Sequence, residues 1–196
     1  AETVGISPVP GQIKKAKKLA EERGLADTCK FLVGDDRSTP FPDEHFDVVL
    51  ACESLCHADE KLDFYKEVYR ILKPGGRLII AEYLRSERPL TEKGEKWIHK
   101  WLDGCAIKDI DTLEEHQQNA RIAGFSELKS DDVTQYMKGS LRRLFRVSTL
   151  LYPLGVFFLW TGVRNKVMHM NQVGSIYQYR ALKKDFWSYH FLSAIK

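Results

Sequence analysis

Four short apolar runs of the sequence are each followed by polar side chains that could do chemistry. Carboxylate oxygens can accept a hydrogen bond from an exocyclic amine such as that of adenine, and a histidine can accept a proton near neutral pH. The candidates, in chain order, are Ser7, Asp35 with Asp36, the stretch 52–57 (Cys-Glu-Ser-Leu-Cys-His), and Glu82 with Tyr83. Open parallel sheets bind ligands beyond the carboxyl ends of their strands. The spacing therefore predicts that these residues share one edge of a sheet.

His57 is the best-placed general base among these residues. A base near neutral pH removes the proton when an oxygen or nitrogen atom is the nucleophile. Helix capping or packing explains a histidine at this position equally well. A solvated loop is likewise the commoner explanation of two adjacent aspartates such as Asp35 and Asp36.

The cysteines indicate neither a disulfide framework nor a metal centre. Cys29, Cys52, Cys56 and Cys105 include no Cys-x-x-Cys pair, so we expect reduced thiols in a reducing compartment. Cys52, Cys56 and His57 are close in sequence, but a closed zinc site needs a fourth ligand at suitable spacing. We therefore predict plain buried thiols and no metal.

Alternating strand and helix patterns predict the sheet that would position the candidate residues. Apolar, β-branched runs are typical of strands buried on both faces, and apolar residues at helical spacing indicate amphipathic helices. The predicted strands span 3–7, 29–33, 46–52 and 77–83, and the predicted helices span 12–23 and 61–72. This order is typical of an α/β fold with a doubly wound, mostly parallel sheet.

The pattern changes after residue 84. The sequence predicts helices at 92–102 and 112–123 and strands at 125–129 and 187–195. Between them lies a helical insertion rich in Arg, Tyr, Phe, Trp and Met. We therefore divide the chain into a ligand-binding core at 1–132, a helical cap or lid at 133–180, and a strand at 181–196 that returns to the sheet.

Composition excludes several classes of protein. Of the 196 residues, 43% are hydrophobic and 29% are charged, which is typical of a globular chain and excludes a disordered or collagen-like one. The net charge of +3 is too balanced for a dedicated nucleic-acid binder. A basic patch at Lys14, Lys15, Lys17 and Lys18 is typical of the solvated face of a helix.

An uncharged stretch lies inside the predicted cap. Residues 147–163 carry no charge, and these 17 residues fall short of the roughly 20 apolar residues of a spanning helix. The basic residues that bracket the stretch are Arg142, Arg143, Arg146, Arg164 and Lys166. We predict a hydrophobic lid over a pocket, able to lie on a bilayer surface through residues 142–166.

Several motifs resemble those of the class I S-adenosylmethionine-dependent methyltransferases, and the resemblance covers essentially the whole chain from Thr3. The matching stretches are Phe-Leu-Val-Gly-Asp at 31–35, Pro-Phe-Pro-Asp at 40–43, Phe-Asp-Val-Val at 46–49, Glu-Ser-x-x-His at 53–57, and Arg-Ile-Leu-Lys-Pro-Gly-Gly-Arg-Leu at 70–78. Gly-Ile-Ser-Pro at 5–8 with Gln12 looks most like the branch that methylates sterols, tocopherols and natural products. The resemblance implies a Rossmann-like fold, S-adenosylmethionine as cofactor and in-line methyl transfer.

The resemblance also implies which residues contact the cofactor. Asp35 would hold the adenine together with backbone groups near Asp36, and Cys52 and Glu53 would line the floor beside the methionine part. At the ribose this chain has Ser7 where many members have an acid. The implied set is Ile6, Ser7, Asp35, Asp36, Cys52 and Glu53.

The family's first strand and Gly-rich loop have no counterpart before Thr3. In the family this segment packs against the methionyl and ribose parts of the cofactor. The chain starts Ala-Glu-Thr-Val-Gly-Ile-Ser, with neither an initiator Met nor the arrangement of a signal peptide. We therefore expect the native protein to extend further towards its N-terminus.

Aromatic residues of the predicted cap indicate an apolar methyl acceptor, since a small polar substrate would call for converging charges. We expect an isoprenoid, sterol-like, phenolic or alkaloid acceptor. His57 would be the base for an oxygen or nitrogen acceptor, whereas Glu53 and aromatic rings would stabilise the carbocation formed from a carbon acceptor. The predicted acceptor-binding residues are Tyr152, Phe157, Phe158, Trp160 and Tyr177. Ordinary packing in a helical cap is the alternative for each of them.

The sequence favours this function over three others. A nicotinamide-dependent oxidoreductase would need a dinucleotide-binding Gly motif, which is missing from the sequence. A degenerate methyltransferase-like domain without catalysis would serve as an interaction module, and a nucleic-acid substrate is disfavoured by the charge. We expect a cytoplasmic enzyme that acts on a lipophilic small molecule. Any contact with a membrane would be peripheral. The sequence is compatible with a homo-oligomer.

Overall fold

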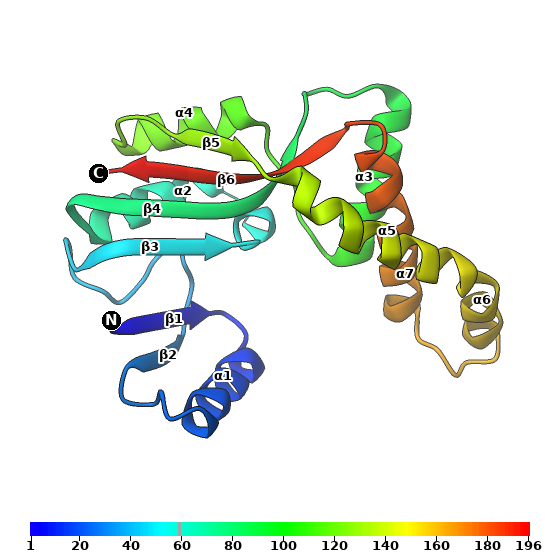
Figure 1. Cartoon of the computed structure of the whole chain (residues 1–196), viewed down its shortest axis with the longest axis horizontal. Helices are drawn as coiled ribbons and strands as arrows, with labels where there is room; N and C mark the ends of the chain where they lie inside the picture. Colours follow the sequence, from blue (N-terminus) through cyan, green and yellow to red (C-terminus); the bar gives the residue numbers. More distant parts are fainter. Residues whose placement is uncertain (59) are drawn as a thin grey trace.

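The computed structural model describes residues 1–58 and 60–196, and its strands lie in two sheets (Figure 1). Strands β1 (Thr3–Ser7) and β2 (Cys29–Val33) form a parallel pair. The second sheet has the order β3-β4-β6-β5. Its strands are β3 (Phe46–Cys52), β4 (Leu72–Arg85), β6 (Trp187–Ile195) and β5 (Lys129–Asp132). The strand patterns predicted α/β architecture correctly, but they do not specify pairing, and the expected single sheet is divided.

The N-terminal unit consists of β1, β2 and the helix α1 (Pro10–Glu22). The helix begins two residues earlier than predicted because proline suits the first helical position, where its missing N–H is not needed. Ile13 and Ala20 are buried, and the Lys-rich face is exposed. Gly24, with φ of 66°, follows the end of the helix in a left-handed conformation that costs glycine little.

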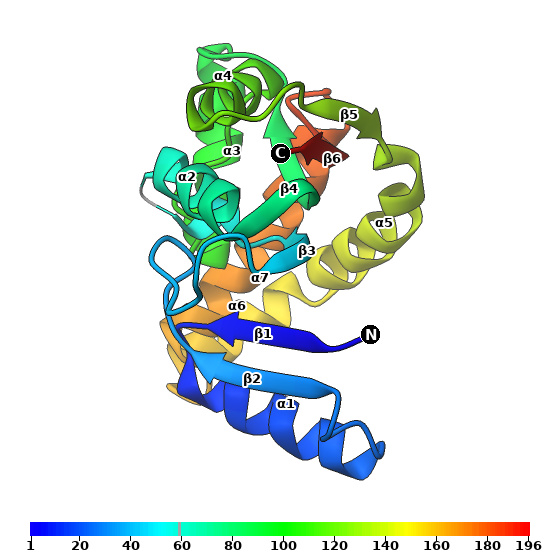
Figure 2. The same cartoon turned by 90° about the vertical axis from the view of Figure 1, so that its left-hand side faces the viewer.

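Side chains of β4 alternate between two hydrophobic cores, as the pleat of a strand requires. Leu78 and Ile80 point to the core formed with α2 (Lys61–Ile71) and α4 (Leu113–Ala123). Ala81 and Tyr83 point to a second core with Trp101 of α3 (Glu92–Cys105). The neighbouring strand β6 alternates in the same way. The two cores therefore join the sheet to the helices packed beside it (Figure 2).

Two strand boundaries differ from the predictions. The strand expected at 125–129 is β5 at 129–132, because Phe125 instead packs its ring against Tyr69 of α2, with centroids 5.2 Å apart. The strand expected at 77–83 begins at Leu72, where a register shift between Phe46 and Val48 of β3 accommodates the Lys-Pro-Gly-Gly segment.

Three helices form an arm that projects from the sheet: α5 (Thr134–Leu150), α6 (Tyr152–Trp160) and α7 (Lys166–Leu182). We call residues 134–182 the helical arm. Helix α7 packs on α3, where Gly104 and Gly174 let the two backbones approach closely. A Cβ at Gly104 would lie 2.7 Å from the Gly174 Cα and 2.5 Å from the Met170 carbonyl oxygen. The arm is therefore held to the core by a crossing that has no room for a side chain.

Replacing Gly104 with alanine should lower the free energy of unfolding by about 2 kcal/mol, because the added methyl group overpacks this crossing. Gly139→Ala is the matched control, since nothing lies within 4 Å of a Cβ there. That control should be neutral or stabilising by up to about 1 kcal/mol through helix propensity. Urea denaturation of both variants measures the difference, and equal stabilities would contradict the packing described.

Candidate functional site

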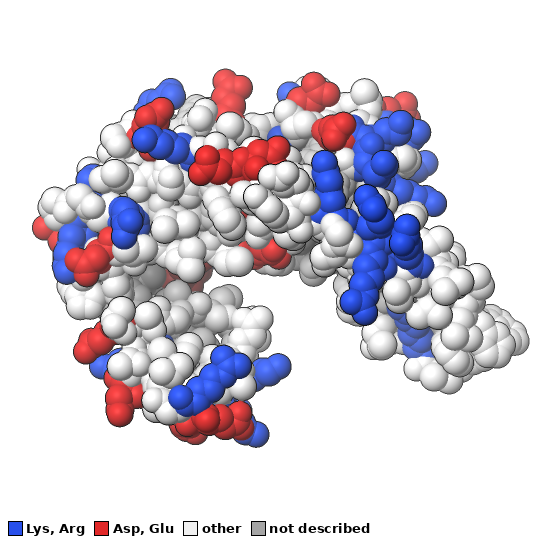
Figure 3. All heavy atoms as spheres, in the orientation of Figure 1, with Lys and Arg blue, Asp and Glu red and all other residues white. Residues whose placement is uncertain are grey.

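The carboxyl ends of β1, β2, β3 and β4 face one side of the molecule. β1 pairs in parallel with β2, and β3 pairs in parallel with β4. In Figure 1 these strands run towards the helical arm, and Figure 3 shows a wide hollow between the N-terminal unit and that arm. The carboxyl ends of these strands thus face this hollow, although Glu82 and Tyr83 of β4 are themselves buried.

Ile6, Ser7 and Asp35 lie together at the carboxyl edge of the N-terminal unit. The Gly34 N–H donates to the Ser7 carbonyl oxygen at 3.1 Å. A Cβ at Gly34 would lie 2.8 Å from Ile6 Cδ1, so glycine lets the Ile6 side chain pack on this turn. The close approach positions the carboxylates that follow Gly34.

The Asp35 carboxylate is ionised and already holds Arg37. Arg37 donates to Oδ1 through its backbone N at 2.9 Å and its Nε at 3.0 Å, and to Oδ2 through Nη2 at 2.7 Å. These hydrogen bonds lower the pKa of Asp35 to about 2. A carboxylate offers about four lone-pair positions; Arg37 fills three of them, and the Asp36 side chain also hydrogen-bonds to Asp35. Burial, and then the charge of Asp35, raise the pKa of the neighbouring Asp36.

The Ser7 hydroxyl also makes hydrogen bonds within the protein. It donates to Gln12 Oε1 at 2.7 Å and accepts from the Val9 N–H at 3.2 Å. A hydroxyl has one donor and two acceptor positions. Ser7 can therefore accept one more hydrogen bond but has no proton left to donate.

Glu53 follows β3 in a left-handed conformation, with φ of 50°, that is uncommon for a residue with a side chain. Two hydrogen bonds hold it there: its N–H donates to the Ala81 carbonyl oxygen at 2.9 Å, and its Oε1 accepts from Tyr189 Oη at 2.9 Å. Burial raises the pKa of Tyr189 and of Tyr83, so both phenols stay protonated. The strained residue is thus tied to both β4 and β6.

The partner Tyr189 was not among the residues singled out from the sequence. It lies 136 residues from Glu53 along the chain. The antiparallel register of β6 places it opposite Tyr83, with ring centroids 5.1 Å apart. The only signal in the sequence was the alternation of aromatic residues in the last strand, which indicates a buried face but no specific partner.

Glu82 is a buried carboxyl at the same edge, with 1% of its surface exposed. It accepts from the Cys56 N–H at 3.2 Å and from the Tyr83 N–H at 3.0 Å. Burial raises its pKa to about 7 against the opposite effect of these hydrogen bonds. Glu82 therefore holds the short helix η1 (Leu55–His57) against β4 and is partly protonated near neutral pH.

His57 is exposed at the end of η1. Its Nδ1 lies 3.1 Å from the Ala106 carbonyl oxygen, which can only accept, so Nδ1 carries the proton and Nε2 carries the lone pair. This tautomer is suited to a base.

The two cysteines of this stretch differ in exposure. Cys52 lies exposed at the end of β3, whereas Cys56 is buried, and burial raises the pKa of the Cys56 thiol.

The structure separates the five predicted acceptor-binding residues into two groups. Tyr152 and Tyr177 line a cavity of about 290 Å³ between α6 and α7. The remaining residues that line it are Thr149, Pro153, Val173, Ile176 and Arg180. Phe157, Phe158 and Trp160 lie outside this lining, exposed on α6.

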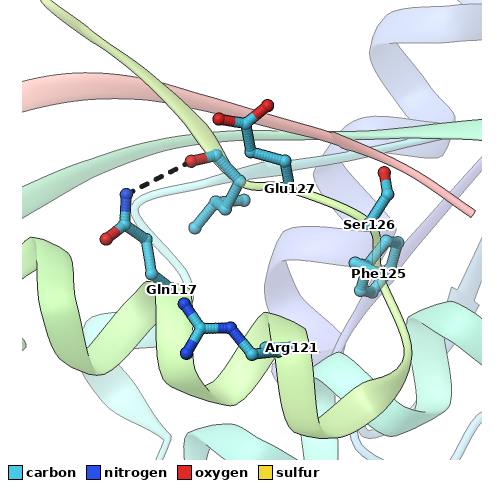
Figure 4. A pocket seen from close by; sticks show the side chains of 6 residues that line it. Gln117, Arg121, Phe125, Ser126 and Glu127 are labelled. Atoms are coloured by element: carbon cyan, nitrogen blue, oxygen red, sulfur yellow. Dashed lines mark hydrogen bonds between the residues drawn. The ribbon is translucent and has the colours of Figure 1, made fainter.

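A second cavity, of about 150 Å³, lies at the opposite edge of the sheet (Figure 4). Gln117 and Arg121 project from α4 towards the loop 125–128, and Gln117 donates to the Leu128 carbonyl oxygen at 3.4 Å. Ser126 Oγ donates to the carbonyl oxygen of Ile195, which pairs with Arg77 in the first half of β4. This cavity is thus remote from the candidate site.

Comparison with known proteins gives matches to methyltransferases. Residues 1–80 match a family model described as a methyltransferase domain. Cycloartenol-C-24-methyltransferase 1 of Oryza sativa subsp. japonica is 31% identical over 137 residues, which cover 69% of this chain and 40% of that protein. The chloroplastic tocopherol O-methyltransferase of Arabidopsis thaliana is 34% identical over 140 residues, covering 65% of this chain and 40% of that protein.

A solved structure of geranyl diphosphate methyltransferase in complex with SAM shares the fold, with a TM-score of 0.76 and 15% sequence identity. The match covers 100% of this chain and 68% of that one. The chain spans less than half the length of the two curated relatives.

Glu82→Gln should flatten the dependence of stability on pH between about 4.5 and 7. The folded pKa of Glu82, about 7, lies above its ordinary value of 4.5. The folded state therefore retains a proton that the unfolded state loses, and stability falls as pH rises through this window. In the native protein, the raised pKa of Glu82 should lower the free energy of unfolding by up to about 3 kcal/mol across this pH range.

Thermal or urea denaturation of both proteins across this range measures the difference. The variant should gain stability relative to the native protein as pH rises. A constant difference between the two proteins from pH 4 to 8 would contradict the raised pKa.

Proposed function

The chain belongs to the class I S-adenosylmethionine-dependent methyltransferases, and from that premise we propose that it is part of an enzyme that methylates a lipophilic small molecule. The observation that carries the proposal is the placement of Asp35 and Glu53. The strands that position them end on the same side of the molecule, beside the hollow. This is the edge at which sheets of this kind hold their ligands.

The residues at this edge fit an adenine nucleoside with a charged sulfur. Asp35 is ionised, and its Oδ2, which accepts one hydrogen bond from Arg37, suits the exocyclic amine of adenine. Ser7 has one acceptor position left, which suits a ribose hydroxyl. The carboxylate of Glu53, held by Tyr189, supplies negative charge for a cationic sulfur.

S-adenosylmethionine supplies an electrophilic methyl group when bound. Because its sulfonium charge already activates the donor, the protein's main tasks are to align the acceptor and exclude water. Glu53 is suited to alignment, since its backbone is strained and its carboxylate is fixed by a second strand. His57 Nε2 is the atom that would take the proton from an oxygen or nitrogen acceptor.

The largely apolar cavity beside Tyr152 and Tyr177 supports a lipophilic acceptor. Only Thr149, Arg180 and the two phenols bring polar groups to its lining. Its volume of about 290 Å³ is near the lower end for small-molecule sites. The names of the two curated relatives refer to a cycloartenol and a tocopherol acceptor, which supports the same class here.

Asp35→Ala should weaken binding of S-adenosylhomocysteine by about 10- to 100-fold, because a hydrogen bond to a charged acceptor contributes roughly 1.5–3 kcal/mol. Isothermal titration of the whole protein measures the change. Asp47→Ala is the matched control, since Asp47 also pairs with one neighbouring cation, Lys73 at 2.8 Å. If Asp35→Ala and the native protein bind equally well, Asp35 does not contact the adenine. If the native protein itself fails to bind, the non-catalytic alternative is favoured.

His57→Gln should lower kcat by at least about 100-fold while leaving the affinity for S-adenosylhomocysteine within about twofold, because only proton removal is lost. The acceptor is first identified by mass spectrometry, after a lipid extract is incubated with methyl-labelled S-adenosylmethionine. His45→Gln is the control, since His45 is exposed just before β3, at the opposite edge. An unchanged kcat would leave His57 a purely structural role for that acceptor.

A further inference from the structure

One segment of the chain carries basic residues and no acid. Residues 133–184 contain nine Lys or Arg and no Asp or Glu. The other residues hold 21 Lys or Arg (30 minus 9) and all 27 acids, a net charge of −6. The helical arm is therefore a cationic appendage on an anionic body, although the chain as a whole has a charge of only +3.

The end of the helical arm is apolar and exposed. We call residues 150–163 the apolar tip. Helix α6 within it has no charged residue on any face, yet Gly155 alone of its nine residues is buried. Exposed fractions reach 80% at Leu150, 83% at Trp160 and 77% at Val163. A helix that is hydrophobic all round is normally buried in a core or in lipid, and a patch of this kind marks an interaction site.

Basic side chains border the apolar tip. Arg142, Arg143 and Arg146 are exposed on α5, which leads into the tip, and Lys166 is exposed just after it. Figure 3 shows blue side chains over α5 beside the uncharged end of the arm. Cationic and apolar groups can therefore engage one partner at the same time.

We propose that the helical arm docks on an anionic lipid bilayer, with the apolar tip in the headgroup region and the arginines of α5 on the anionic headgroups. Aliphatic side chains such as Leu150 and Val163 suit acyl chains, and tryptophan and tyrosine favour the membrane interface. Clustered Lys and Arg next to an apolar helix favour acidic lipids. Among the described residues no helix is long and apolar enough to cross a bilayer, so the contact is peripheral.

A second copy of the chain is the less favourable occupant of this surface. A symmetric dimer would place the same patch of each copy against the other. Two arms of like charge would then face each other without an acidic residue from either segment to compensate. Anionic headgroups supply the missing counter-charge. The inference depends on charge and exposure alone, and not on methyl transfer.

Vesicle flotation tests the proposal on the whole protein, with phosphatidylcholine vesicles compared with vesicles that contain 30% phosphatidylserine. We expect at least tenfold more protein bound to the anionic vesicles. This preference should be lost in 1 M NaCl, where the Debye length falls to about 3 Å. Brominated lipid should quench mainly Trp160, which is 83% exposed, because Trp101 and Trp187 are fully buried and Trp97, on α3 outside the helical arm, is only partly exposed. Trp160→Phe should lose most of that quenching.

Two variants separate the charged and apolar contributions. Arg142→Gln/Arg143→Gln/Arg146→Gln should reduce the anionic preference at least tenfold, and Phe157→Ser/Trp160→Ser should reduce binding to anionic vesicles. The matched control is Lys14→Gln/Lys15→Gln/Lys17→Gln, which removes three exposed charges from α1 and should change nothing. Circular dichroism confirms that each variant is folded.

Equal flotation with the two kinds of vesicle would overturn the proposal. So would unchanged binding of the triple arginine variant. A dimer found by light scattering, abolished by Phe157→Ser/Trp160→Ser and formed without vesicle binding, would assign the tip to a second copy. Binding of S-adenosylhomocysteine, titrated on the same sample, shows separately whether the cofactor site functions.

Discussion

The parallel pairing of β3 with β4 is the constraint on which the site depends. Parallel strands end at the same edge, so this register places Glu53 and Glu82 on one side of the molecule. Strand β6 then pairs with β4 in the antiparallel sense and carries Tyr189 back to that edge, where it reaches Glu53. Strand pairing thus brings together three segments that are far apart in the chain.

Burial of a carboxyl at this edge has a structural and a chemical consequence. Glu82 uses its two oxygens to hold the backbone N–H groups of Cys56 and Tyr83, which fixes η1 and with it His57. The same burial raises the pKa of Glu82 to about 7. A group that anchors the candidate base is therefore itself near its midpoint of protonation at neutral pH, as is common at functional sites.

The two proposals place an apolar partner at each of two sites on the helical arm. The small cavity beside Tyr152 and Tyr177 lies between its helices, and its end exposes the apolar tip. The close crossing of α3 and α7 at Gly104 and Gly174 fixes the arm to the core. An enzyme that takes a lipophilic acceptor and rests on a bilayer would find that acceptor concentrated in the lipid, which connects the two proposals without making either depend on the other.

The sequence by itself determined the element types, the α/β class and the strand ends where Asp35, Glu53 and His57 lie, because apolar periodicity and turn residues are local properties. Only the tertiary structure decided which strands pair, that Arg37 occupies most of the Asp35 carboxylate, and that Tyr189 holds Glu53. It also separated Tyr152 and Tyr177 from Phe157, Phe158 and Trp160, which composition had grouped together. Pairing, burial and hydrogen-bond partners depend on segments distant in the chain, and no local pattern encodes them.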